Sequence, residues 1–209
     1  MKALLGKKLG MTQVFDEKTG EVTPVTVLQL GPCPVVQVKT RDSHGYEAVQ
    51  IGFGDIRSTL VNLPRRGHFA KAGVVPRRVL REFRVEDASQ YEVGKDLTVE
   101  IFEGLERVDI IGTSKGRGFA GTVKRHKFHT GPKSHGSRNY RAPGSIGSNS
   151  TPNRVFKGQR MPGQHGNVRV TVRNVAVAQV DTKNNLMLVG GAVPGAVNGF
   201  VLVRSPKKP

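Results

Sequence analysis

Acidic residues are missing from a long internal stretch of this 209-residue chain, and their absence limits how the chain can fold. No Asp or Glu occurs between Ile110 and Val180. Residues 1–109 carry 16 basic and 15 acidic side chains, whereas residues 110–209 carry 17 basic side chains and one acid, Asp181. The formal net charge of +17 therefore lies almost entirely in the second half. Such a stretch cannot neutralise itself through internal ion pairs, so it requires an external polyanion.

Short apolar runs on both sides of the acid-free stretch predict β-structure. Val22–Leu30 and Val35–Val38 are separated by a turn sequence with two prolines, and a further run covers Ala48–Phe53. Lys18–Gly20 predicts the turn of an earlier hairpin. The chain has no Trp but 26 Gly and 12 Pro, a composition that favours strands and irregular loops over long helices.

Alternation of apolar and polar residues resumes at Val168 and continues to the end of the chain. Val175–Val180 and Leu186–Val189 predict a hairpin, and Phe200–Val203 predicts a last strand before a basic tail. We therefore expect a mainly β fold, a barrel or a sandwich, that is interrupted by a long basic segment.

Residues 56–90 have a mixed pattern. Pro64 is placed to open a short helix that Gly73 ends, and the following Arg77–Phe83 fits either a helix or a strand. Strand patterns return at Leu97–Phe102 and Val108–Ile111. These patterns divide the chain into the first part of the barrel at 1–55, a small α+β insertion at 56–90, barrel strands at 91–112, a basic segment at 113–167, and closing barrel strands with a basic tail at 168–209.

The basic segment has few apolar residues and no hydrophobic period. Residues 112–166 contain 11 Gly, and only Phe119–Phe128 suggests a short helix. A loop of more than about 40 residues is improbable inside a compact domain unless something outside the chain stabilises it. Disordered segments are usually poor in aromatic residues, yet this one contains Phe119, Phe128, Tyr140 and Phe156. We expect it to fold on a partner.

The segment also contains two patterns that resemble cofactor or metal sites. Gly116–Gly121 matches GxGxxG, but a dinucleotide fold needs an acidic residue about 20 positions later, and none occurs before Asp181. His126 and His129 have no Cys or carboxylate nearby, and the surrounding cations would repel a metal ion. We expect no cofactor and no metal; the histidines are better placed to stack on bases or to bind phosphate.

No combination of nucleophile, base and orienting group is evident, so the sequence indicates a binding protein rather than an enzyme with a small-molecule substrate. Cys33 is the single cysteine, which excludes an internal disulfide and predicts a buried, inert thiol in a reducing compartment. The N-terminus lacks the apolar stretch of a secretory signal, and residues 186–203, although uncharged, contain glycines and Pro194. We expect a cytosolic protein that contacts no membrane.

Nucleic acid is the polyanion that these residues fit best. Thirteen Lys and Arg residues lie between Lys115 and Arg173, interleaved with small and aromatic residues. Arg binds phosphates in a bidentate manner and stacks on unpaired bases. No helix or ribbon suited to the major groove of duplex DNA is evident, which favours folded RNA. Two alternatives remain open: a DNA-compacting protein, which would bind duplex DNA equally well, and an RNA-modifying enzyme, which would need a cofactor site.

Several stretches resemble one family of proteins. They are GKKLGMTQVF (6–15), GTSKGRGFAGTVKRHKF (112–128), SHGSRNYRAPGSIG (134–147), RVFKGQRMPGQHGN (154–167) and VRNVAVAQVD (172–181). In order and spacing they are similar to the universal L-three family of large-subunit ribosomal proteins, over essentially the whole chain.

The resemblance implies a translation-factor-type β-barrel with a small α+β insertion and a long irregular extension. It also implies a structural constituent of the large ribosomal subunit that binds ribosomal RNA directly, supports early assembly and extends towards the peptidyl transferase centre. The expected partners are large-subunit ribosomal RNA and neighbouring large-subunit ribosomal proteins, and the expected location is the ribosome in the cytoplasm.

Mapped onto this chain, the resemblance and the residue chemistry together give a set of expected RNA-binding residues. At the base of the extension, and in the stretch that follows it, these are Lys115, Arg117, Lys124, Arg125, His126, Lys127, His129, Lys133, His135, Arg138, Tyr140 and Arg141. At the tip and on the return they are Ser145, Asn149, Ser150, Thr151, Arg154, Lys157, Arg160, His165, Arg169 and Arg173. Many bacterial members carry a methylated glutamine at the position of Ser150, which has no side-chain amide to modify.

Overall fold

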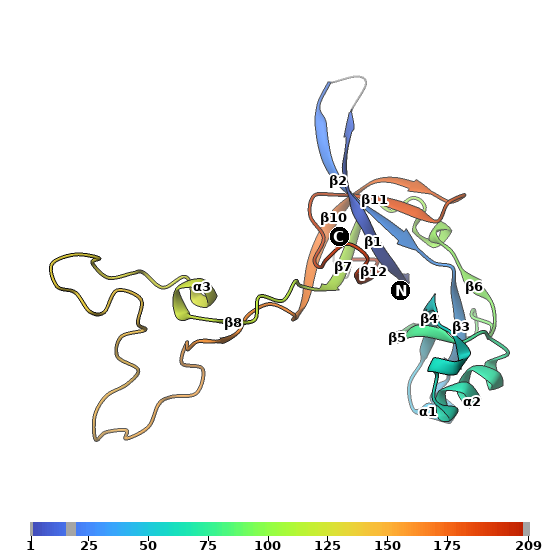
Figure 1. Cartoon of the computed structure of the whole chain (residues 1–209). Helices are drawn as coiled ribbons and strands as arrows, with labels where there is room; N and C mark the ends of the chain where they lie inside the picture. Colours follow the sequence, from blue (N-terminus) through green and yellow to red (C-terminus); the bar gives the residue numbers. More distant parts are fainter. Residues whose placement is uncertain (1, 16–19, 207–209) are drawn as a thin grey trace. The chain divides into compact units, whose positions relative to one another are not determined.

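The computed structural model describes residues 2–15 and 20–206. The chain forms two compact units, one of residues 1–113 and 169–209 and the other of residues 114–168. The first unit contains a barrel and a second sheet, and the second unit is mostly irregular (Figure 1). Within the described ranges, no helix is long and apolar enough to cross a membrane.

The first unit is built on a closed antiparallel barrel. Its strands follow the order β1-β12-β7-β10-β11-β2, and β2 pairs again with β1. Their bounds are β1 Ala3–Phe15, β2 Val22–Leu30, β7 Arg107–Thr113, β10 Arg169–Asp181, β11 Leu186–Gly190 and β12 Phe200–Arg204. Closure gives every strand two neighbours, so the barrel has no open sheet edge. The predicted mainly β fold with a barrel is confirmed.

Alternating apolar residues fill the barrel because successive side chains of a strand point to opposite faces. Leu28 and Leu30 of β2, Val108 and Ile110 of β7, and Met187 of β11 are fully buried. Each such side chain contributes roughly 1.5–3 kcal/mol through the transfer of apolar surface out of water.

A second sheet of order β5-β4-β3-β6 joins the barrel in the first unit. Its strands and short helices are β3 Cys33–Lys39, α1 Arg41–His44, β4 Ala48–Asp55, η1 Ser58–Leu60, α2 Leu63–Ala72, β5 Arg77–Arg84, β6 Asp96–Leu97 and η2 Val99–Phe102. Helix α2 begins beside Pro64 and ends at Gly73 in the left-handed conformation, as predicted. Its buried Phe69 packs with Val36 and Val61 in a small core of its own.

Two of the sequence assignments are corrected by the sheet pairing. Residues 33–55 were expected in the barrel with the rest of 1–55, but β3 and β4 pair with each other in the second sheet. The apolar pattern predicts a strand without revealing its partner. Within 91–112, only β7 joins the barrel. The expected strand Leu97–Phe102 instead gives the short β6 and the 3₁₀ helix η2, because Val99 and Phe102, three residues apart, are both buried on one side of the turn.

Two expected features fall on parts of the chain that are not described. The predicted turn at Lys18–Gly20 includes residues 18 and 19, and the basic tail beyond Pro206 comprises residues 207–209. Both lie outside the described residues.

Cys33 is buried at the start of β3, and its thiol donates a hydrogen bond to the Leu5 carbonyl oxygen at 3.3 Å. Burial raises the pKa of the Cys33 thiol to about 12. The thiol therefore stays protonated at neutral pH and is a poor nucleophile, in agreement with the prediction.

A buried carboxylate links three barrel strands. Asp109 of β7 is 2% exposed and accepts hydrogen bonds from Nη2 and Nε of Arg204 on β12, at 3.1 and 3.3 Å. Its other oxygen accepts the backbone N–H of Asn174 on β10 at 3.1 Å. The register of β10 against β7 shifts between Val172 and Val175, which marks a β-bulge at Asn174. Asp109 therefore hydrogen-bonds the backbone of this bulge and also neutralises the charge of Arg204.

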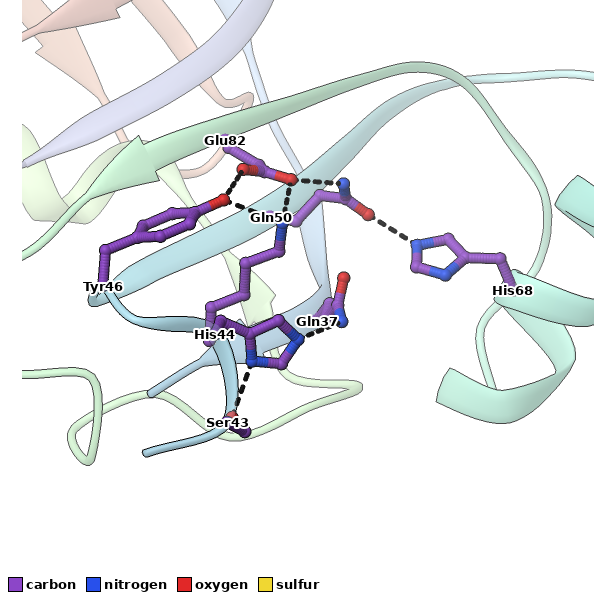
Figure 2. A network of polar contacts seen from close by, with 8 residues as sticks. Gln37, Ser43, His44, Tyr46, Gln50, His68 and Glu82 are labelled. Atoms are coloured by element: carbon purple, nitrogen blue, oxygen red, sulfur yellow. Dashed lines mark hydrogen bonds and ion pairs between the residues drawn. The ribbon is translucent and has the colours of Figure 1, made fainter. Parts of the chain in front are cut away.

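A polar network links strands β3, β4 and β5 of the second sheet and reaches His68 of α2 (Figure 2). The Lys39 ammonium lies 2.6 Å from Glu82 Oε1 and 3.0 Å from the Tyr46 hydroxyl, which donates to Glu82 Oε2. Gln50 donates to the same carboxylate at 3.2 Å, and its oxygen contacts His68 at 2.6 Å. The hydrogen bond from Lys39 lowers the pKa of Glu82, and the bond to Glu82 raises the pKa of Lys39. Both shifts favour the charged forms, and the network ties adjacent strands together.

Asp109→Asn should lower the free energy of unfolding by roughly 2–3 kcal/mol, because it leaves Arg204 without a counter-charge in a largely buried site. Urea unfolding followed by circular dichroism measures the change. The matched control is Asp55→Asn, whose carboxylate pairs with Arg77 at the surface and should contribute less than about 1 kcal/mol. Equal losses in the two variants would contradict the role assigned to Asp109.

Glu82→Gln should remove a pH-dependent part of the stability. Because the pKa of Glu82 is lowered on folding, its contribution is complete above its ordinary pKa of about 4.5 and is lost as the pH falls through the lowered value. The wild type should thus exceed the variant by a constant amount from about pH 6 to 8, and the two should converge in acid. Thermal unfolding measured from pH 8 down into acid, below the ordinary pKa of Glu82, tests this prediction, with the exposed Glu86→Gln as control. A stability difference that grows in acid would refute the assignment.

Candidate nucleic-acid interface

The second unit is closed at its base by a short ladder between its two ends. The Ser114 N–H donates to the Val168 carbonyl at 2.9 Å, and the Arg117 N–H donates to the His165 carbonyl at 2.8 Å. The ladder continues into the two-residue strands β8 Phe119–Ala120 and β9 Gly163–Gln164. The chain thus enters and leaves the unit side by side.

Helix α3 (Thr122–His126) is fixed to the returning chain by two basic side chains. Arg125 Nη1 donates to the Met161 carbonyl oxygen at 2.7 Å, and His126 Nε2 lies 3.0 Å from the same oxygen. A Cβ on Gly163 would stand 2.7 Å from Arg125 Nη1, so the glycine makes room for the guanidinium. Arg125 and His126 were expected to contact RNA; the structure gives both an internal, half-buried role.

Beyond α3 the chain makes few hydrogen bonds with itself. Within residues 127–160, one backbone hydrogen bond joins residues that are far apart in sequence: the Gly131 N–H donates to the Tyr140 carbonyl oxygen at 3.2 Å. The remaining backbone and side-chain bonds of this stretch are local, such as Ser145 Oγ to the Gly147 carbonyl at 3.0 Å. Nearly every residue is exposed. Backbone N–H and C=O groups need partners, so these groups are left to water or to another molecule.

The charge of this unit has one sign. Residues 114–168 contain eleven Lys and Arg and no Asp or Glu, and the ion pairs among the described residues all lie in the first unit. Most of the basic side chains, including Lys124, Arg138 and Lys157, are exposed. The unit therefore presents positive charge without internal compensation, which is the electrostatic property of a phosphate-binding surface.

Exposed aromatic rings lie among these cations. Phe119 and Phe156 are 78% and 58% exposed, and the guanidinium carbon of Arg154 is 5.2 Å from the centre of the Phe156 ring. Aromatic and guanidinium planes are the groups on which unpaired bases stack. Of the aromatic residues here, the expected site included only Tyr140; the exposed rings of Phe119 and Phe156 are further candidates. Their occurrence in an acid-free segment is the signal that could have identified them.

The structure places nearly all the expected site residues in one unit. Those from Lys115 to His165 lie within residues 114–168, on the base ladder, on α3 or on the irregular chain beyond it. Arg169 and Arg173 lie instead on β10 of the barrel. The seven residues Ser145–Thr151 form no helix or strand and are exposed.

The described residues hold no group of three or more His, Cys, Asp or Glu side chains that could bind a metal ion. The exposed cations and aromatic rings of residues 114–168 are suited to binding a polyanion.

Comparison with known proteins agrees with this chemistry. The family model of ribosomal protein L3 matches residues 82–186. The chain is 54% identical over 207 residues to the large ribosomal subunit protein uL3 of Heliobacterium modesticaldum, and the match covers 99% of this chain and 98% of that protein. The resemblance seen in the sequence is confirmed, and the chain belongs to the ribosomal protein L3 family.

Proposed function

We propose that this protein is a non-catalytic, structural constituent of the large ribosomal subunit in the cytoplasm, and that residues 114–168 bind ribosomal RNA directly. The observation that carries the proposal is a unit with eleven cations, no Asp or Glu, and few internal hydrogen bonds beyond its base ladder and α3. Membership of the L3 family supports the ribosomal assignment. Neighbouring large-subunit proteins are the further partners.

The mechanism is electrostatic and geometric. Where RNA helices crowd together their phosphates repel, and each Lys or Arg that neutralises a phosphate releases a bound counterion. Small residues allow the chain to pass between helices, and the rings of Phe119, Tyr140 and Phe156 offer stacking surfaces for unpaired bases. The bound chain thereby stabilises an RNA conformation that repulsion would otherwise oppose.

The family resemblance gives the finer part of the proposal. The protein joins the subunit early in assembly, and residues 145–151 lie deepest, towards the peptidyl transferase centre. The exposed basic residues of the expected site, from Lys115 to Arg160, contact RNA on either side of this tip. Arg125 and His126 also contact RNA at the base of the extension, through the parts of their side chains that remain exposed beside the Met161 carbonyl.

Co-sedimentation of the tagged protein in cell lysate, with high-salt washes of each particle fraction, tests the proposal. The protein should remain with large ribosomal subunits after washing, because a chain enclosed by folded RNA cannot leave one contact at a time, whereas a surface contact is stripped by salt. Recovery with the nucleoid, or as free protein, would overturn the ribosomal assignment.

Arg154→Ala combined with Lys157→Ala should weaken binding to large-subunit RNA and reduce its salt dependence. Loss of two phosphate contacts should lower the slope of log Kobs against log salt by about 1–2. Filter binding at several salt concentrations measures the slope. Arg57→Ala with Lys71→Ala, two exposed cations of the first unit, is the matched control and should leave the slope unchanged. The thermal transition of the barrel should be the same in both; its loss in the first variant would contradict a purely RNA-contacting role.

A further inference from the structure

The first unit, which has almost no net charge before residue 110, contains a cleft of about 460 Å³. Lys7 of β1, Arg77 and Arg78 of β5, and Phe200 of β12 line it, together with Asn198. Lys7 and Phe200 are paired across neighbouring strands, so their side chains emerge on one face of the barrel. The volume is within the range of small-ligand sites.

Two of the three cations of the cleft have no ion-pair partner among the described residues. Within the described part of the chain, the side chains of Lys7 and Arg78 take part in no ion pair or hydrogen bond. Arg77 pairs with Asp55, the one carboxylate that lines the cleft, and that carboxyl side chain is 89% exposed. The Arg77 Nε–H is buried without an acceptor. Three guanidinium and ammonium groups thus face one largely solvated acid, which favours an anion in the cleft.

An aromatic ring adjoins these cations. Phe200 is 40% exposed and meets Phe53 in an edge-to-face arrangement, with ring centres 6.2 Å apart. Gly54, with φ of +76°, lies beside both groups: a Cβ there would be in ordinary contact with the Phe200 ring at 3.4 Å and with the Arg78 stem at 3.6 Å. A ring beside two unpaired cations suits a ligand that is both planar and anionic, and the Asn198 amide can bond the edge of such a plane.

We propose that this cleft binds one unpaired nucleotide of ribosomal RNA, with its base on Phe200 and its phosphate between Lys7 and Arg78. The inference rests on the proposed function, but it assigns a second RNA contact outside residues 110–180. An acidic protein side chain would satisfy the cations and leave the ring unused. Paired helices present stacked bases that a cleft of this size does not admit, whereas a base turned out of a loop enters readily.

Ultraviolet crosslinking of native large subunits that contain this chain tests the proposal. Nucleotide-modified peptides are identified by mass spectrometry, and we expect one adduct at Phe200 and others within residues 114–168. Lys7→Ala with Arg78→Ala should reduce the Phe200 adduct by at least about tenfold, the factor for losing one or two charge-assisted hydrogen bonds. The adducts within 114–168 should keep their yield. Arg57→Ala with Lys71→Ala is the control of equal charge and should leave both unchanged.

The outcomes separate the two proposals. Adducts within 114–168 without one at Phe200, or a chemical crosslink from Lys7 to another protein, overturn the nucleotide cleft and leave the proposed function intact. A Phe200 adduct that falls equally in both double variants overturns the role of Lys7 and Arg78. The absence of adducts in both regions refutes the proposed function itself. Thermal unfolding of each double variant establishes that the barrel is folded.

Discussion

The pairing of β7 with β10 is the constraint on which the rest of the structure depends. Thr113 at the end of β7 is the register partner of Arg169 at the start of β10, so residues 114–168 are inserted at a single rung of the barrel. Asp109, four residues before Thr113 on β7, stabilises the same strand pair, since it bonds the β10 bulge at Asn174 and the guanidinium of Arg204. Because the barrel closes without residues 114–168, this insertion does not need a hydrophobic core of its own to stabilise the fold. Its residues are consequently free to be basic, small and exposed.

The strands of the barrel could be predicted from the sequence because each carries its own apolar alternation. β2, β11 and β12 were found nearly to the residue. The partners of β3 and β4 could not be predicted, because hydrogen bonding between strands is the same in either sheet and the deciding contacts come from residues far away in sequence. The 3₁₀ helix at Val99–Phe102 was missed for a related reason: four residues with apolar side chains at both ends satisfy a strand and a tight turn equally well.

The candidate interface was predictable in extent but not in detail. The absence of carboxylates in residues 110–180 is a property of the sequence, and it marks the segment without any structure. That Arg125 and His126 bond the Met161 carbonyl depends on a chain reversal that no local pattern encodes. The cleft could not be foreseen either. Lys7 and Arg78 are distant in sequence and belong to a half whose charges nearly cancel, so only the fold brings them together.

On the proposed RNA-binding function, the base ladder of residues 114–120 and 163–168 has a consequence for the kinetics of binding. Because both ends of the long loop are tied, the entropy of closing that loop is already lost before any RNA is met. Once one Lys or Arg side chain has bound a phosphate, the neighbouring basic side chains are confined to a small volume around the neighbouring phosphates. Each later contact therefore forms at a high effective concentration. Departure then requires many weak contacts to open at the same moment. A chain with such a tether behaves as one multivalent ligand whose residence time greatly exceeds that of any single contact.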